Sequence, residues 1–166
     1  MSQTYEELLD GTPITRRAPN PRHELICTRL HECIRASIAN FSGTQLLPPR
    51  SPVQFSPQTT FRPDVALVTT ATGKLWLAGE VVSSDDHQPD TVIKKQIYEE
   101  LRVPRLWMID PRYDNIEVYH ATPFGLALKT ILAGREVLTE KLLPEFQVAV
   151  YELFAAETME KKNGRR

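Results

Sequence analysis

The sequence has no hydrophobic run that could cross a membrane. A membrane-spanning helix needs about 20 consecutive apolar residues, and charged residues or some of the 13 prolines interrupt every apolar stretch of this 166-residue chain well before that length. The first seven residues, MSQTYEE, are acidic and lack the basic start and apolar run of a signal peptide. These absences predict a cytoplasmic protein with no membrane partner.

Cysteine is scarce. Cys27 and Cys33 lie six positions apart in a predicted helix, which points them to different sides and gives poor geometry for a disulfide. His23, Cys27 and His31 follow at helical spacing and could suggest zinc, but structural zinc sites usually have four ligands, and no CxxC or HExxH pattern occurs. The favoured interpretation is a reduced protein in which these residues pack, with zinc as the weaker alternative.

The chain has no excess of charge of one sign. The 20 Lys and Arg residues face 21 Asp and Glu residues, for a net charge of −1. Nucleic-acid-binding domains are often strongly basic, so any binding to DNA would need a local patch. The candidate residues are Arg16, Arg17 and Arg22 near the start, and Lys94, Lys95, Arg102 and Arg105 further on.

Residues 61–111 contain short apolar runs with carboxylates beside them. Asp64 precedes the run 65–68, and Glu80 follows the run 75–78. The linker between the two runs, 69–74, has the length and composition of a hairpin turn. Two antiparallel strands are therefore predicted here.

A hairpin centred near Thr72 places Asp64 opposite Glu80 on the neighbouring strand. Because side chains alternate with period two, one face is predicted to carry Asp64, Ala66, Val68, Trp76, Ala78 and Glu80. Opposed residues have Cβ atoms roughly 4.5–5.5 Å apart. Two carboxylates at that separation repel each other unless a positive charge lies between them, and a divalent cation is the natural candidate.

A helix is predicted from Asp90 to Val103-Pro104. Three polar residues of this helix follow one another at intervals of four positions and would therefore lie on one face: Asp90, Lys94 and Tyr98. The apolar run 106–109 then predicts another strand. The predicted order is strand, hairpin, strand, helix, strand, with the lysine facing the carboxylate pair.

At these residues the chain resembles the large bacterial family of putative restriction endonucleases within the PD-(D/E)XK nuclease superfamily. The matching residues are Pro63-Asp64, Glu80-Val81-Val82-Ser83, Asp90, Lys94, Tyr98, Val103-Pro104, Trp107 and Asp110-Pro111. Weaker matches extend to Glu7–Gly11, Pro21–His23, Leu142–Pro144 and Phe154. The resemblance covers nearly the whole chain and implies a restriction endonuclease-like α+β fold, with a mixed central sheet flanked by helices.

The resemblance also implies roles for particular residues. Asp64 and Glu80 would hold Mg²⁺ or Mn²⁺, and Lys94 would complete the catalytic set. The superfamily's short motif places its lysine at what is here Val82, so the lysine is expected to have moved to the helix. Asp90, Tyr98, His23 and Glu7 are accessory candidates. Arg102 stands where the family usually has a glycine before Val-Pro.

Outside this segment the pattern is less informative. Residues 22–41 predict a helix with Ile26, Leu30, Cys33, Ile34, Ser37, Ile38 and Phe41 on its apolar face. A short strand is predicted within 4–20, and a mobile loop over 42–62 with a strand near 53–55. Strands at 115–119, 126–132 and 136–138 are predicted to extend the sheet antiparallel. Residues 1–156 are expected to form one nuclease-like domain, with a last helical turn at 151–156 and a flexible tail at 157–166.

The favoured hypothesis is a Mg²⁺-dependent endonuclease that hydrolyses DNA phosphodiester bonds by metal-activated water. The alternative is a nuclease fold that no longer cuts and serves as a DNA- or protein-binding module or a homodimer. A junction resolvase would share the chemistry and differ in substrate. Each residue also has a simpler explanation: Asp64 could cap a turn, Asp90 a helix, and Lys94 could be a solvated lysine like Lys95, paired at most with Asp90.

Overall fold

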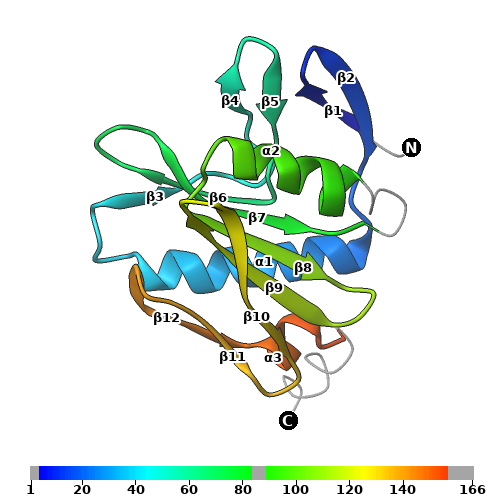
Figure 1. Cartoon of the computed structure of the whole chain (residues 1–166). Coiled ribbons are helices and arrows are strands. Elements are labelled where there is room, and N and C mark those ends of the chain that lie inside the picture. Colours follow the sequence, from blue (N-terminus) through cyan, green and yellow to red (C-terminus); the bar gives the residue numbers. More distant parts are fainter. Residues whose placement is uncertain (1–3, 84–88, 157–166) are drawn as a thin grey trace.

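A six-stranded mixed sheet forms the centre of the protein. The computed structural model describes residues 4–83 and 89–156, except for the side chains of 89–91. The strand order is β10-β9-β8-β7-β6-β3 (Figure 1). The bounds are β3 Thr44–Leu46, β6 Val65–Thr69, β7 Leu75–Val81, β8 Arg105–Asp110, β9 Asn115–Thr122 and β10 Gly125–Ala133. The predicted α+β class with a mixed central sheet is therefore confirmed.

The order strand, hairpin, strand, helix, strand is also confirmed. β6 and β7 pair antiparallel, and β8 pairs parallel to β7 after the helical crossover. β8 is buried along almost its whole length because both faces of the sheet are covered there. β9 and β10 then add antiparallel strands, as predicted.

The register of the β6–β7 hairpin is the predicted one beside the carboxylates. Val65 pairs with Gly79 and Ala66 with Ala78, and continuing this register brings Asp64 opposite Glu80. A bulge nearer the turn pairs Val68 with Leu75. Trp76 therefore lies on the opposite face from the one predicted, where its indole N–H donates to Thr44 Oγ1 at 2.7 Å. The prediction was wrong at Trp76 because a bulge shifts the alternation by one residue.

Helix α1 (Pro21–Ser37) covers one face of the sheet (Figure 1). The Asn20 side chain caps its N-terminus by accepting a hydrogen bond from the His23 amide at 2.8 Å. The predicted apolar face is correct for Ile26, Leu30 and Ile34, which are buried in the core on this side. The helix ends before Phe41, which is 46% exposed, so the prediction extended the helix too far.

A small four-stranded sheet and a second helical segment cover the other face. The order of this sheet is β2-β1-β5-β4, with β1 Thr4–Leu9, β2 Thr12–Arg17, β4 Val53–Ser56 and β5 Thr59–Phe61. Residues 42–62, expected to be a mobile loop, thus contain three short strands, of which sequence analysis predicted only β4. The prolines obscured the pattern, and strands of three residues are too short to show a period.

The helical segment that follows β7 begins as a π-helix. η1 spans Pro89–Lys94 and continues into α2, Lys95–Glu100. Ile97 and Tyr98 of α2 pack into a second hydrophobic core, on the face of the sheet opposite α1, together with Leu9 and Phe61. The predicted helix is therefore present, but its first half is wound differently from an α-helix.

The C-terminal strands form a separate hairpin. β11 (Val137–Glu140) pairs with β12 (Leu143–Ala149), and α3 (Val150–Phe154) follows. The prediction that residues 136–138 extend the main sheet was wrong, because the apolar side chains of Leu138, Phe146 and Val148 pack into the core on the α1 side. The predicted tail at 157–166 lies outside the described residues. No helix among those residues is long and apolar enough to cross a membrane.

Gly79 permits the close approach of β6 and β7 beside the carboxylates. A Cβ added at Gly79 would lie 3.0 Å from Val65 Cβ and 3.4 Å from Val65 Cγ2. Val65 is fully buried and cannot move aside. Gly79→Ala is therefore expected to lower the free energy of unfolding by about 1–3 kcal/mol, measured by urea denaturation.

Gly43→Ala is the matched control for that measurement. The added Cβ would make ordinary contacts at 3.6 Å with the Phe41 ring. This variant is expected to be unchanged or stabilised by up to about 1 kcal/mol. Equal stability of both variants would contradict the proposed steric constraint at Gly79.

Candidate active site

Asp64 immediately precedes β6 and is 4% exposed. Its Oδ2 accepts a hydrogen bond from the Val81 amide at 2.9 Å, and His23 Nε2 lies 3.4 Å from the same oxygen. Its Oδ1 is contacted by Arg50 Nη1 at 3.2 Å. Asp64 therefore does more than cap a turn, because its carboxylate joins three separate segments of the chain.

Glu80, on β7, accepts hydrogen bonds from side chains of the helical segment η1–α2. Lys94 Nζ and the Tyr98 hydroxyl donate to its Oε1 at 2.8 and 2.7 Å. Glu80 is 2% exposed and Lys94 1%. The π-helical winding of η1 still presents Lys94 and Tyr98 to the same carboxylate oxygen. Lys95 instead lies over the Tyr119 ring, 4.5 Å from its centroid.

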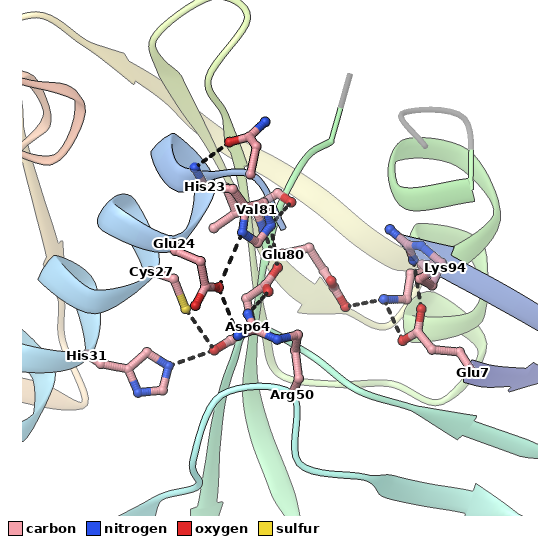
Figure 2. A network of polar contacts seen from close by, with 12 residues as sticks. Glu7, His23, Glu24, Cys27, His31, Arg50, Asp64, Glu80, Val81 and Lys94 are labelled. Carbon is pink, nitrogen blue, oxygen red and sulfur yellow. Dashed lines mark hydrogen bonds and ion pairs between the residues drawn. The ribbon is translucent and has the colours of Figure 1, made fainter. Parts of the chain in front are cut away.

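Glu7 of β1 brings a third carboxylate to the same place. Its Oε2 lies 2.8 Å from Lys94 Nζ, so the ammonium group bridges Glu7 and Glu80. Glu7 Oε1 accepts from Arg16 Nη1 at 2.7 Å, and Oε2 also accepts from the Arg62 amide at 2.7 Å. Figure 2 shows Asp64 between the α1 side chains on one side and Glu80, Lys94 and Glu7 on the other.

An aromatic cluster closes the site on the α2 side. Phe61 and Tyr98 meet edge-to-face with ring centroids 5.3 Å apart, and Lys94 Nζ lies 5.2 Å from the Phe61 centroid. Burial and the negative charge of Glu80 raise the pKa of Tyr98 well above its usual value. Tyr98 is therefore a neutral hydrogen-bond donor that fixes the Glu80 carboxylate.

Two α1 side chains hold the main chain at Asp64. His31 Nε2 and Cys27 Sγ both contact the Asp64 carbonyl oxygen, at 2.6 and 3.6 Å. His23 contacts the Val81 carbonyl at 2.9 Å through Nε2. The helical spacing that could suggest zinc therefore aligns three side chains along the start of β6 and the end of β7. Cys27 and Cys33 are both free, as predicted.

His23 and Asp64 stabilise each other's charged forms. Burial by itself lowers the pKa of His23, but contact with Asp64 and the Val81 carbonyl outweighs it, so the pKa lies above its ordinary value. Burial by itself raises the pKa of Asp64, but contacts with His23 and the Val81 amide hold that pKa below its ordinary value. Asp64 is thus ionised at neutral pH.

Several residues of the site were missed by sequence analysis. Arg50 contacts Asp64 from the β3–β4 loop, and Arg16 pairs with Glu7. Tyr5 lies close enough that burial and the charge of Asp64 raise its pKa. The alternation of Tyr5, Glu7 and Leu9 along β1 was the available signal. The η1 backbone includes Asp90, but its side chain lies outside the described residues, so its accessory role stays a prediction.

Four of the seven basic residues considered from the sequence pair with acidic side chains. Arg16 and Lys94 are buried on carboxylates. Arg22 pairs with Asp114, and Arg105 with Glu140 at 3.0 Å. A local basic patch that binds DNA therefore stays a prediction.

The donor set at Asp64 and Glu80 fits a hard divalent cation. Both side chains offer carboxylate oxygens, the ligands that Mg²⁺ and Mn²⁺ prefer. The two residues oppose each other when the β6–β7 register is continued by one residue beyond Val65 and Gly79. No group of three or more His, Cys, Asp or Glu side chains suited to a metal occurs among the described residues. Mg²⁺ sites commonly use one or two carboxylates with water and substrate phosphate supplying the remaining ligands, so two are sufficient.

The fold is shared with a solved structure. The chain resembles the crystal structure of a "putative nuclease belonging to DUF820" from Anabaena variabilis, with a TM-score of 0.74 and 14% sequence identity over 90% of this chain and 89% of that one. No curated protein gives a significant sequence match. A family model named Uma2, described as "Putative restriction endonuclease", matches residues 2–151, and the chain belongs to this family.

Lys94 is expected to be the main support of the buried carboxylates. Lys94→Met would leave Glu7 and Glu80 without the ammonium that bridges them, at a cost of about 3–5 kcal/mol in the free energy of unfolding. Lys95→Met is the matched control and should cost less than about 1 kcal/mol. Urea denaturation at neutral pH measures both. Similar losses for the two variants would contradict the bridging role.

The two histidines of α1 are expected to affect stability with opposite pH dependence in the metal-free protein. The raised pKa of His23 means that its contribution is fully present below its unfolded pKa of 6.5 and is lost as the pH rises through the folded value. Burial lowers the pKa of His31, so its contribution falls as the pH drops below 6.5. Denaturation of His23→Gln and His31→Gln with a chelator, from acidic to alkaline pH, measures both trends. Parallel trends would contradict this assignment.

Proposed function

We propose that the protein is a metal-dependent endonuclease that hydrolyses phosphodiester bonds in DNA. The observation that carries the proposal is the meeting of Asp64 and Glu80, from paired strands, with Lys94 from the following helical segment. Membership of the Uma2 family supports the reaction class. We also propose that residues 1–156 act as one nuclease-like domain, in agreement with the family match to residues 2–151.

The carboxylates would hold Mg²⁺ or Mn²⁺, which supplies the Lewis acidity that polarises the phosphodiester and acidifies the attacking water. Asp64 is kept ionised and in place by the Val81 amide and His23. The Tyr98 hydroxyl holds Oε1 of Glu80 and thereby sets the orientation of the carboxylate. These contacts preorganise the oxygens before any ligand arrives.

Lys94 would stabilise the negative charge that develops on the phosphate, or orient the attacking water. Glu7 contributes by holding the ammonium from the side opposite Glu80, so that Lys94 keeps its charge in a buried position. Glu7 and Tyr98 are positioning residues in this scheme, since each acts through another side chain. His23 acts likewise through Asp64.

A nuclease fold without activity is the second candidate. Asp64, Glu80 and Lys94 are each less than 5% exposed and already contact oppositely charged or hydrogen-bonding partners. Buried charges that are already paired in this way could serve only to stabilise the fold. The domain would then bind DNA or protein, or form a homodimer, without cutting. Titration with Mn²⁺ separates the two candidates, because a catalytic site should lose affinity in Asp64→Asn whereas an inactive one should show no dependence on Asp64.

Cleavage of DNA is expected with Mg²⁺ or Mn²⁺ and should stop when a chelator is added. Asp64→Asn and Glu80→Gln should each lower the rate by at least about a hundredfold, because they remove charge from the cation ligands while keeping their shape. Gel assays on linear, supercoiled and branched DNA measure the rate and the preferred substrate.

Glu140→Gln is the matched control for this experiment. Glu140 is also a buried strand glutamate, but it pairs with Arg105 away from Asp64 and Glu80. The control should retain activity, and the unfolding curve of each variant should show that it is folded. Undiminished cleavage by Glu80→Gln would remove Glu80 from the mechanism, and cleavage that persists in chelator would remove the cation.

A further inference from the structure

Arg50 is the more exposed of the two cationic side chains that contact Asp64. Its guanidinium lies between two carboxylates, with Nη1 3.2 Å from Asp64 Oδ1 and Nη2 2.8 Å from Glu24 Oε1 (Figure 2). The Arg50 side chain is 20% exposed, whereas the side chains of Asp64 and Glu80 beneath it are 5% and 3% exposed. A cation that reaches Asp64 from this side has to pass Arg50.

The backbone at Arg50 is unfavourable for a residue with a side chain. Arg50 has φ +58° and occupies the third position of a turn closed by the Ser51 amide on the Pro48 carbonyl at 3.2 Å, with Pro49 before it. Glycine or asparagine is preferred at such a position. Retention of strained backbone often accompanies function, so the arginine side chain itself is the feature that needs an explanation.

A hollow in the surface adjoins the guanidinium. Its volume is ≈ 350 Å³, and its lining includes Tyr5, Glu24, Arg50 and Arg62. The Arg62 guanidinium donates to two main-chain carbonyls, Glu6 O and Arg50 O, both at 3.2 Å. Its charge therefore faces neutral acceptors and is available to attract an anion in the hollow. Two arginines beside a candidate nuclease centre match the chemistry of a phosphate group.

One oxygen of Asp64 cannot bind Arg50 and a divalent cation at the same time. Oδ2 already faces the Val81 amide and His23, so a cation is expected to compete for Oδ1. Two positive groups on one oxygen repel each other, and the guanidinium would leave. The side chain of its other partner, Glu24, is 46% exposed, and although Glu24 Oε1 is buried, His23 Nδ1 lies 4.0 Å from that oxygen as another partner.

We infer that Arg50 is a displaceable counter-ion of the active site. Without a divalent cation it pairs with Asp64 and Glu24 and closes the site. When a cation takes Asp64, Arg50 turns into the hollow and, with Arg62, contacts a backbone phosphate of the nucleic acid. The inference rests on the proposed nuclease function. It assigns Arg50 a positioning and substrate-binding role, and it couples binding of the cation to binding of the phosphate.

The test compares Arg50→Gly with the natural protein in two binding measurements. Glycine suits the turn, so this variant removes the side chain while keeping the backbone. Loss of a cation from buried Asp64 is expected to lower the melting temperature, so both measurements are made at a temperature at which the unfolding curve shows the variant to be folded. Calorimetric titration with Mn²⁺ is expected to show affinity raised about tenfold, because a competing cation has been removed from Asp64. Binding of a short fluorescent DNA duplex in saturating Mn²⁺ is expected to weaken about tenfold, because a charged phosphate contact has been lost.

Arg35→Ala is the matched control, because Arg35 is an exposed arginine in the last turn of α1 and its loss removes the same charge. This control should change neither affinity appreciably. A fall in both affinities in Arg50→Gly would show that Arg50 only stabilises the site, and an unchanged Mn²⁺ affinity would exclude competition; either result overturns the inference. Equal weakening of DNA binding in Arg35→Ala would overturn the phosphate contact.

A separate control distinguishes failure of this inference from failure of the proposed function. Asp64→Asn should abolish high-affinity Mn²⁺ binding. If the natural protein binds no Mn²⁺ in a manner that depends on Asp64, the nuclease proposal fails and the role of Arg50 fails with it. If that binding is present but Arg50→Gly leaves it unaltered, the nuclease proposal stands and the inference alone is wrong.

Discussion

The interior of this protein has to accommodate carboxylates that repel one another. Glu7, Asp64 and Glu80 come from three separate segments of the chain and are nearly inaccessible to solvent. Such burial is tolerated only when positive groups and hydrogen-bond donors accompany the charges. Lys94 meets this need by bridging Glu7 and Glu80, and Arg50 meets it at Asp64. The position of the helical segment on the sheet follows from this constraint, because Lys94 must reach both acids.

The same constraint connects the small N-terminal sheet with the central one. Glu7 belongs to the hairpin β1–β2 and accepts a hydrogen bond from the Arg62 amide, two residues before Asp64. The hairpin is thereby fixed over the carboxylates on the side where α2 packs. On the opposite side, α1 contacts Asp64 and Val81 through histidine side chains. The three carboxylates thus lie at the open end of the β6–β7 hairpin, where the small N-terminal sheet on one side and α1 on the other contact it.

Local pattern was sufficient to predict the centre of the fold. Alternation and a turn of hairpin length gave the correct pairing of Val65 with Gly79, and hence the opposition of Asp64 and Glu80. The prediction from alternation failed at Trp76, because a β-bulge shifts the alternation of side chains and the sequence pattern does not reveal where the bulge occurs. Arg102, which stands in place of the family's usual glycine, has φ +55° just after α2, and this left-handed backbone is the physical reason why glycine suits the position.

The sequence by itself determined the strands and helix that carry Asp64, Glu80 and Lys94, because periodicity and turn chemistry are local properties of the chain. Only the tertiary structure decided that Lys94 also holds Glu7 and that Arg50 accompanies Asp64. Arg50 lies in a proline-rich loop without periodicity, and its contact with Asp64 depends on β3, β4 and β5 packing as they do. Such a contact arises from the docking of separate layers, and no pattern along the chain encodes the distance between layers.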